Sequence, residues 1–466
     1  MIMNRYFNKI LLVSLAVAAM SVTSCKDEPD KYEIADGKPV VNYIRCLSSE
    51  VVGQQDDEDT KYTNGELVES AYPSSTLCLV GENLRSVVEI YFNDLKASLN
   101  TSYITDNTLI VNVPSNVPGK VTNKMYLISS SEDTLDVDFQ VIISAPTVVS
   151  MSCEYAPIGS TATIYGSYII DDPLEPLTVT FKNAAGQDLP AEDIVVADDY
   201  SSVSFTIPEG AVEGPINVKS VYGTTKAPFQ YCDTRGLMFD FDGVTGLGNH
   251  GWHDRVITSD ETSLTGKFVQ LGDGTVTLDA QAGWNDGDFS FEYWCGSWDT
   301  PQNVTSGDGI ALNNLVDFSN WENMSLKFEM YIPTSAPWKS GAMQIAFEGY
   351  DRVTISGNAI DGWTGTVKAA NAHIFNGEEN QGNYGRAMYR PWTATGSFDT
   401  NNEWMTVTIP LNTFIYDKDG GTTGVEPPKS AADFASLTIF VMGGGIDGEE
   451  CTPHIKIDNI RAVPNK

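Results

Sequence analysis

Tryptophan is absent from the first half of this sequence: the first 251 of its 466 residues contain none, and all nine tryptophans lie beyond Gly236. Basic residues are also few, with 28 Lys and Arg against 62 Asp and Glu and a formal net charge of −34. A surface this negative repels nucleic acid, anionic lipid and acidic polymers, which excludes them as partners. A neutral ligand is unaffected.

Cysteine patterns and common catalytic motifs are missing too. The seven cysteines include no C-x-x-C pair and are too widely spaced for a zinc site or a dense disulfide scaffold. The six that follow Cys25 would either pair in an oxidising compartment or remain buried thiols, and we favour thiols. No G-x-S-x-G, H-E-x-x-H or glycine-rich phosphate loop is present, so the corresponding hydrolase and nucleotide sites are not expected.

The amino terminus has the organisation of a bacterial export signal. Two basic residues precede an apolar run over residues 10–20, which is too short to span a bilayer. The V-T-S-C sequence at 22–25 resembles a lipobox. It predicts a lipoprotein signal peptide over residues 1–24 and lipid attachment at Cys25, the alternative being an ordinary signal peptide with a chance cysteine.

The segment that follows the lipobox suggests where the protein is sent. Residues 25–37 are polar and without periodicity, so we interpret them as a tether. Within them, K-D-E at 26–28 resembles the acidic tag that directs lipoproteins of Bacteroides-type bacteria to the cell exterior. No later run of 18 apolar residues exists, so we expect an outer-membrane lipoprotein that faces the cell surface and is held by its lipid.

Forty glycines and 22 prolines, with few long helical patterns, favour an all-β chain. Residues 38–145 and 146–231 follow one plan and are predicted to be two Ig-like sandwiches, similar to the IPT/TIG variant of that fold. The paired motifs are PVV at 39–41 and PTVV at 146–149, LCLVG at 77–81 and ATIYG at 162–166, IYFN at 90–93 and VTFKN at 179–183, and LIVNVP at 109–114 and VSFTIP at 203–208.

Residues 232–466 are predicted to form one larger β-sandwich of jelly-roll character. Apolar residues alternate with polar ones in several of its segments, which is typical of strands with one buried face, while a continuous apolar run indicates a central strand. The alternating segments are 326–331, 343–347 and 405–409, the continuous run is 437–442, and a natural last strand is 455–460.

Seven of the nine tryptophans of this sandwich fall into two groups. Trp321 and Trp404 lie beside regular strands and are assigned to packing. Five others lie in loops rich in Gly, Pro, Ser and Thr, where we expect exposure because loops run over the surface. These five are Trp294, Trp298, Trp338, Trp363 and Trp392. A flat indole covers the apolar face of a sugar ring, and nearby amide, carboxylate and guanidinium groups satisfy its hydroxyls.

Three motifs of the C-terminal half, together with the lipobox and tandem Ig-like modules, resemble a known family. They are WENMSLKFE at 321–329, YRPW at 389–392 and WMTVTIPL at 404–411. The family is the surface glycan-binding proteins of Bacteroidetes polysaccharide-utilisation loci, with a C-terminal domain that resembles the xyloglucan-binding one.

The resemblance implies a non-catalytic lipoprotein without a cofactor. It would capture a neutral β-linked glucan or a hemicellulose such as xyloglucan and assist its uptake by a TonB-dependent outer-membrane transporter. Two or three aromatic residues form the platform in such domains. The candidates for glycan binding here are Trp298, Trp338, Trp363, Trp392 and Tyr389, with Gln381 and Arg390 as hydrogen-bonding residues.

Three alternatives stay open. A glycoside hydrolase would need a pair of carboxylates, for which Asp286 with Asp288, or Glu378 with Glu379, are nominal candidates. An adhesive protein would bind host protein through the Ig-like modules and use its tryptophans for packing only. A structural calcium ion would fit if three carboxylates met at one sandwich edge, but we assign no metal ligand and no catalytic residue. Those carboxylates are Asp240, Asp242 and Asp458.

Overall fold

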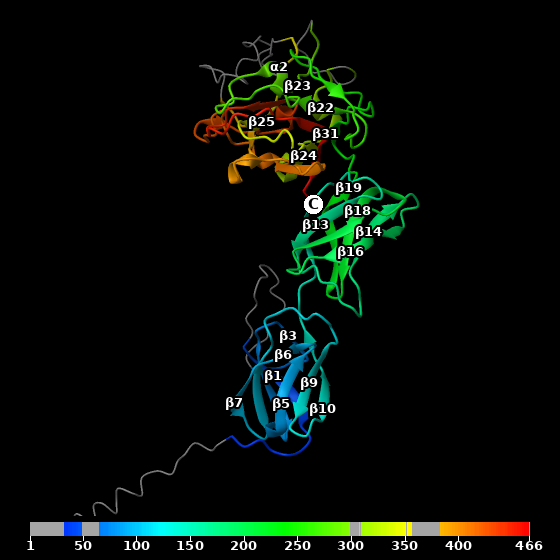
Figure 1. The fold of residues 1–466 in the computed structure, drawn as a ribbon, viewed down its shortest axis with the longest axis vertical. Helices are drawn as coiled ribbons and strands as arrows, with labels where there is room; N and C mark the ends of the chain where they lie inside the picture. Colours follow the sequence, from blue (N-terminus) through cyan, green and yellow to red (C-terminus); the bar gives the residue numbers. More distant parts are fainter. Residues whose placement is uncertain are drawn as a thin grey trace, which may run out of the picture. The chain divides into compact units, whose positions relative to one another are not determined.

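The structure of the protein, a computed structural model, describes residues 32–48, 65–298, 307, 309–350, 352–356 and 383–465. These residues form β-strands with only short helical turns (Figure 1), which confirms the predicted all-β class. The chain divides into two compact units, one of residues 1–144 and 172–174 and the other of residues 145–171 and 175–466. No helix among the described residues is long and apolar enough to cross a bilayer.

The first unit is a sandwich of two main sheets with strand orders β2-β1-β4-β8-β7 and β10-β9-β5-β6, and β11 pairs with β3 in parallel. Several of its strands alternate buried and partly buried residues, as β9 does, so that one face of each sheet forms the core. Its elements are β1 (Val40–Ser48), β2 (Glu66–Leu67), β3 (Ser70–Ala71), β4 (Thr76–Glu82), η2 (Leu84–Ser86), β5 (Val87–Phe92), β6 (Leu95–Lys96), β7 (Leu99–Ile104), β8 (Thr108–Asn112), β9 (Lys124–Ser129), β10 (Thr134–Asp138) and β11 (Gln140–Val141).

The second unit begins with another sandwich, whose sheets have the orders β12-β13-β17-β16 and β15-β14-β18-β19. Apolar residues from both sheets meet in one core, which includes Ile164, Phe181 and Phe205. Its strands are β12 (Thr147–Met151), β13 (Thr161–Ser167), β14 (Thr178–Asn183), β15 (Asp188–Pro190), β16 (Glu192–Val196), β17 (Ser202–Thr206), β18 (Ala211–Ser220) and β19 (Gly223–Tyr231).

One of the paired motifs ends in glycine in both modules, and the reason is steric. Gly81 and Gly166 end the apolar runs of β4 and β13, and each lies against the first strand of its own sandwich. A Cβ atom would overlap the carbonyl oxygen of Val40 in the first case and of Thr147 in the second. The two modules therefore need glycine at the same point because two strands approach too closely there for any side chain.

The remainder of the second unit is a two-sheet sandwich with helical turns in its connections. One sheet has the order β21-β22-β31-β24-β28, with β20 also paired to β31, and the other is β23-β30-β25-β27. The elements are β20 (Leu237–Phe239), β21 (Ile257–Thr258), β22 (Phe268–Leu271), α2 (Asp286–Phe289), β23 (Ser290–Tyr293), α3 (Leu312–Leu315), η3 (Trp321–Asn323), β24 (Met324–Tyr331), β25 (Ala342–Glu348), β26 (Asn383–Tyr384), β27 (Ala387–Tyr389), η4 (Pro391–Ala394), β28 (Met405–Pro410), η5 (Leu411–Thr413), β29 (Val425–Glu426), η6 (Ala431–Asp433), β30 (Ser436–Met442) and β31 (Ile455–Pro464).

The strands expected from the sequence of this last sandwich are all present. The three alternating segments lie in β24, β25 and β28, and the last predicted strand lies in β31. The continuous apolar run forms β30, which pairs with β23 on one side and β25 on the other and is therefore a central strand, as predicted. A single apolar core fills the space between the two sheets.

The second Ig-like module and the C-terminal sandwich pack directly on each other. Trp404 lies against the core of the module, and a cluster of four buried charged residues joins the two parts. Glu154 of the module accepts from Lys327 and, at 2.8 Å, from Arg461, and Arg461 also bonds Glu329 at 2.7 and 3.0 Å. The described strands fall within residues 40–141, 147–231 and 237–464, which match the three predicted modules. The chain nevertheless divides into two compact units, so the division into three modules stays our interpretation.

Candidate functional site

The candidate site lies on the outer face of the sheet β23-β30-β25-β27. Residues Leu437, Ile439 and Val441 of β30 point into the core between the two sheets. Because side chains alternate along a strand, Thr438 and Phe440 point to the opposite face. A second apolar cluster covers that face and combines Phe440 with Trp294, Val353 and Ile355. The outer face also carries buried polar residues, among them Glu292, Gln344 and Thr438, so its apolar cluster is local. This cluster offers a base on which further aromatic rings can pack.

Two half-exposed tryptophans pack on this outer cluster. The Trp252 ring lies 5.0 Å from that of Trp294, edge to face at 77°, and its indole N–H donates to the carbonyl of Ile355 at 3.1 Å. The Trp284 ring lies 5.1 Å from that of Phe440. Trp252 is 45% exposed and Trp284 43%. Each exposed indole therefore rests on a buried aromatic ring and presents part of its surface to solvent.

The strand register places the backbones of the two supports at different points along the sheet. Ser290 pairs with Phe440, and Trp294 follows Ser290 by four residues, which span on the order of 13 Å along a strand. The two rings lie closer than this, because the Trp294 indole N–H donates to Thr438 Oγ1 at 3.0 Å and Trp294 shares one apolar cluster with Phe440. Trp252 and Trp284 therefore pack on neighbouring parts of one continuous cluster.

Trp298 is a third exposed aromatic residue close in sequence to this face. It is 63% exposed and follows Trp294 by four residues. Gly296, with φ of 95°, turns the chain between them, and its N–H donates to the carbonyl of Gly309 at 2.8 Å. The exposure predicted for Trp298 is confirmed, although its binding role remains a prediction.

The exposure predicted for three loop tryptophans is wrong. Trp294, Trp338 and Trp392 are buried, the last two within the core between the sheets. Their N–H groups are satisfied inside the protein: Trp338 donates to Ser340 and Trp392 to Gly341. The physical reason is that their loops fold back over the sandwich, so the large ring fills the core rather than the surface. Trp338 and Trp392 are therefore removed from the candidate platform.

The structure describes only two of the four remaining candidates for glycan binding. Trp363 and Gln381 lie outside the described residues. Tyr389 is half-buried against Trp338, at 6.2 Å between rings, and burial raises the pKa of its hydroxyl to about 12. Arg390 donates to the carbonyl of Gly444. Nothing in the structure tests the proposed binding role of these four residues.

The two tryptophans assigned to packing do pack. Trp321 is partly buried against the core of the C-terminal sandwich, 5.7 Å from the Phe434 ring. Trp404 packs on the second Ig-like module and lies 5.6 Å from the Tyr331 ring. Trp252 and Trp284 were not among the residues expected from the sequence to bind glycan, although both lie in Gly/Asn/Asp-rich loops, and that composition is the signal that could have identified them.

Neither nominal carboxylate pair lies wholly within the described side chains, so the structure does not test them as a hydrolase site. Asp288 bonds Asn285 at 3.1 Å, as expected for a turn. The side chain of Asp286 lies outside the described part of the chain, as do Glu378 and Glu379.

The acidic residues considered for calcium have separate partners. Asp240 caps a turn by accepting from the backbone of residues 244 and 245. Asp242 accepts from Lys267 N–H at 2.7 Å, and Asp458 accepts from Thr265 Oγ1 at 2.8 Å. Burial raises the pKa of Asp458 to about 7. Within the described residues no three His, Cys, Asp or Glu side chains group as metal ligands, and the six cysteines after Cys25 are free thiols.

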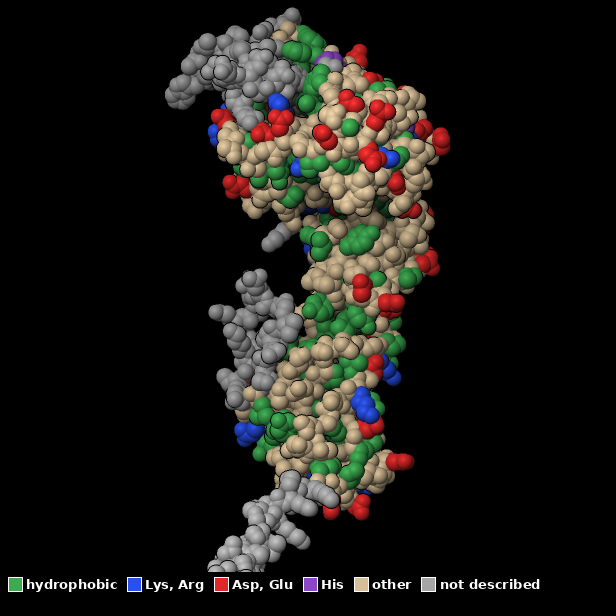
Figure 2. Space-filling view, turned by 60° about the vertical axis from the view of Figure 1, so that its left-hand side comes forward, with side chains coloured by type: hydrophobic (Ala, Val, Ile, Leu, Met, Phe, Trp, Pro, Cys, Tyr) green, Lys and Arg blue, Asp and Glu red, His purple; other side chains and the backbone are tan. Residues whose placement is uncertain are grey.

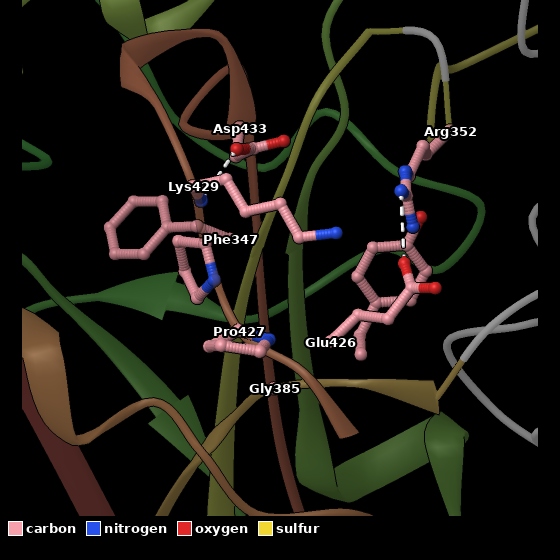
Figure 3. Close-up of a pocket in the computed structure, with 9 residues that line it drawn as sticks. Phe347, Arg352, Gly385, Glu426, Pro427, Lys429 and Asp433 are labelled. Atoms are coloured by element: carbon pink, nitrogen blue, oxygen red, sulfur yellow. Dashed lines mark hydrogen bonds and ion pairs between the residues drawn. The ribbon is translucent and has the colours of Figure 1, made fainter. Parts of the chain in front are cut away.

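A small pocket beside the end of β25 is the hollow drawn in Figure 3. Arg352 lies 4.4 Å from the centre of the Tyr384 ring and bonds Glu426 at 3.1 Å, so the arginine is already paired on one wall of the pocket. The hollow has room for little more than water and cannot take a sugar ring. Figure 2 shows instead that acidic side chains outnumber basic ones over the visible face of the C-terminal sandwich, with hydrophobic side chains between them.

The fold agrees with comparisons to known proteins. A family model described as the surface glycan-binding protein B xyloglucan binding domain matches residues 231–464. The crystal structure of surface glycan-binding protein PbSGBP-B from Prevotella bryantii is 44% identical, with 93% of this chain and 100% of that chain covered and a TM-score of 0.79. An IPT/TIG domain-containing protein of Bacteroides ovatus is 20% identical over 445 residues, covering 70% of this chain and 85% of that protein.

The chain belongs to the surface glycan-binding protein B family. This confirms the family expected from the sequence and the prediction of a non-catalytic glycan-binding protein at the cell surface, and it sets aside the glycoside-hydrolase alternative.

Proposed function

We propose that the C-terminal sandwich binds a neutral β-linked polysaccharide, xyloglucan or a related glucan, on the outer face of the sheet β23-β30-β25-β27. The observation that carries this proposal is the pair Trp252 and Trp284, each exposed and each resting on a buried aromatic ring of the same face. Aromatic anchors of this kind dominate binding energy, and their rigid support lowers the entropy lost on binding. The match of residues 231–464 to a xyloglucan-binding family model supports the same ligand.

Trp298 is the third proposed contact, because it is the most exposed tryptophan among the described residues. Trp363, Gln381, Tyr389 and Arg390 remain secondary proposals that rest on the sequence alone. The net charge of −34 supports a neutral ligand over an acidic polysaccharide, because a polyanion would have to approach against the field of the protein.

The attachment to the cell is part of the proposal. A lipid on Cys25 would hold the protein at the outer membrane, residues 25–37 would form the tether, and a TonB-dependent transporter would receive the captured chain. Replacing Cys25 with Ala should release the exported protein from the membrane fraction and abolish palmitate labelling. Unchanged membrane association and labelling would contradict the lipid site without touching glycan binding.

Affinity electrophoresis in gels that contain xyloglucan, mixed-linkage glucan, laminarin or mannan tests the ligand. Retardation is expected in xyloglucan or another β-glucan, and it should fall when Trp252, Trp284 or Trp298 is replaced with Ala. Tyr103→Ala is the matched control, because Tyr103 is an exposed aromatic residue of the first module. No retardation in any of the four gels would favour an adhesive protein instead.

A further inference from the structure

The loop that carries Trp252 is organised by a buried carboxylate. Glu292 lies on β23 and is fully buried. Its Oε2 accepts from the backbone N–H of Trp252 at 2.8 Å and of His253 at 3.3 Å, and its Oε1 lies 2.8 Å from Nδ1 of His253. A buried charged group that accepts several hydrogen bonds fixes the groups that donate them, because each lost bond leaves a desolvated acceptor.

The backbone of the same loop is paired to β23. The N–H of His250 donates to the carbonyl of Glu292 at 3.0 Å, and the N–H of Trp294 donates to the carbonyl of His250 at 2.7 Å. Gly251 lies so close to Glu292 that a Cβ atom there would overlap the glutamate side chain. The loop therefore fits against Glu292 in one arrangement, and a glycine at 251 is required for it.

These contacts determine how Trp252 meets solvent. Its backbone is held by Glu292, its ring by Trp294, and its indole N–H by Ile355. Because the N–H is already bonded within the protein, the indole is left to act through its apolar surface, which is what stacking on a sugar ring uses. Without Glu292 the ring would keep its contact area but lose the fixed orientation that lowers the entropic cost of binding.

We propose that Glu292 is a positioning residue for glycan binding: it does not touch the glycan but holds the 250–253 loop so that Trp252 presents its ring. This inference rests on the proposed function of the outer sheet face. If Glu292 acts only by holding Trp252, replacing both residues should weaken glycan binding by less than the sum of the two single effects on the binding free energy.

A double-mutant cycle tests the proposal, with affinity for xyloglucan measured by calorimetry and the melting temperature measured in parallel. Trp252→Ala should weaken binding about tenfold or more. Glu292→Ala should weaken it to a similar extent in the otherwise native chain but by less than about twofold when Trp252 is already Ala. Glu292→Gln, which keeps one acceptor oxygen, should bind with an affinity between those of the native chain and Glu292→Ala.

Two further variants guard against a simple loss of folding. Gly251→Ala displaces the loop while both Glu292 and Trp252 remain, and it should weaken binding as Glu292→Ala does. Asp240→Asn removes another buried carboxylate that caps a turn of the same sandwich, and binding should be unchanged. Hydrogen exchange at the amides of Trp252 and His253 should speed up in Glu292→Ala and not in Asp240→Asn.

The outcomes separate this inference from the function it rests on. If Glu292→Ala weakens binding equally with and without Trp252, the carboxylate acts elsewhere and the positioning role is overturned. If Trp252→Ala binds normally while Trp284→Ala or Trp298→Ala does not, the positioning role is also overturned but glycan binding on this face stands. If the native chain binds none of the tested glucans, both proposals fail.

Discussion

The carboxylate of Glu154, in the second Ig-like module, lies 2.8 Å from the guanidinium of Arg461 on β31, the last strand of the C-terminal sandwich. The two residues are 307 positions apart in the sequence, and both side chains are almost fully buried. Glu329 bonds the same guanidinium from β24. Burial lowers the pKa of Arg461, but the two carboxylates outweigh it and hold that pKa above its usual value. The module is therefore joined to the sandwich by charges that cannot be removed singly without leaving a partner unpaired.

Glu154→Gln should lower the free energy of unfolding of the second unit by about 3–5 kcal/mol, because Arg461 and Lys327 lose a buried counter-charge. Denaturant unfolding measures this. Asp188→Asn in the same module is the control, since it breaks the pair with Lys182 at the surface, where Asp188 is 62% exposed. The control should cost no more than about 1 kcal/mol. Equal, small effects of the two changes would show that the buried cluster does not stabilise the junction.

The buried and exposed tryptophans should behave in opposite ways. Trp338→Ala leaves a cavity in the core of the C-terminal sandwich and should cost roughly 3–5 kcal/mol of unfolding free energy. Trp298→Ala removes an exposed ring and should change stability by no more than about 0.5 kcal/mol. Thermal and denaturant unfolding give both values. A stable Trp338→Ala variant would mean that this ring does not fill the core as the structure shows.

Stability should fall as the pH rises through the range in which Asp458 ionises. Burial is the main cause that raises the pKa of this carboxyl from 3.8 to about 7, with Glu329 and Asp242 adding repulsion. The folded protein therefore holds a proton that the unfolded chain has already released between about pH 4 and pH 7, so stability is lost as the pH rises across that window. The contribution amounts to at most roughly 4 kcal/mol.

Asp458→Asn removes this titration. The variant should gain stability relative to the native chain on going from pH 4 to pH 8, and denaturant unfolding at several pH values would show it. Asp242→Asn is a useful comparison, because it removes one source of repulsion and leaves the buried carboxyl in place. Parallel pH profiles of the native chain and Asp458→Asn would contradict the account.

Salt should have little effect on binding of a neutral glucan. With a net charge of −34, the protein repels anions at a distance, but an uncharged chain that stacks on indole rings feels none of this field. Calorimetry between low and high ionic strength should give the same affinity for xyloglucan. A carboxymethylated glucan should bind less tightly at low salt and recover as salt is added. A strong salt dependence for the neutral polymer would point to charged groups in the site.

Much of the fold could be read from the sequence because strand periodicity and repeated motifs are local signals. Alternating apolar and polar residues predicted the positions of β24, β25 and β28. The continuous apolar run of β30 predicted both its position and its central place in the sheet. Gly81 and Gly166 marked the repeat because each meets a neighbouring strand too closely for a side chain.

The candidate site was harder to predict because burial in a loop is decided by distant parts of the chain. Trp338 and Trp392 lie in loops of turn-forming composition, yet these loops fold inward and bury the rings. Trp252 owes its position to Glu292, which is 40 residues away. The sequence around Trp252 does not indicate that its loop contacts Glu292. Loop composition alone therefore favoured Trp338 and Trp392 over Trp252.

The most direct test of the central claim is calorimetric titration of xyloglucan into the native chain and into a variant in which Trp252 and Trp284 are both replaced with Ala. The account predicts measurable binding by the native chain and a loss of about 100-fold or more in the variant, with the melting temperature nearly unchanged because both rings are half exposed. Native-like affinity in the double variant would contradict it, since the glycan would then be held somewhere other than the outer face of this sheet.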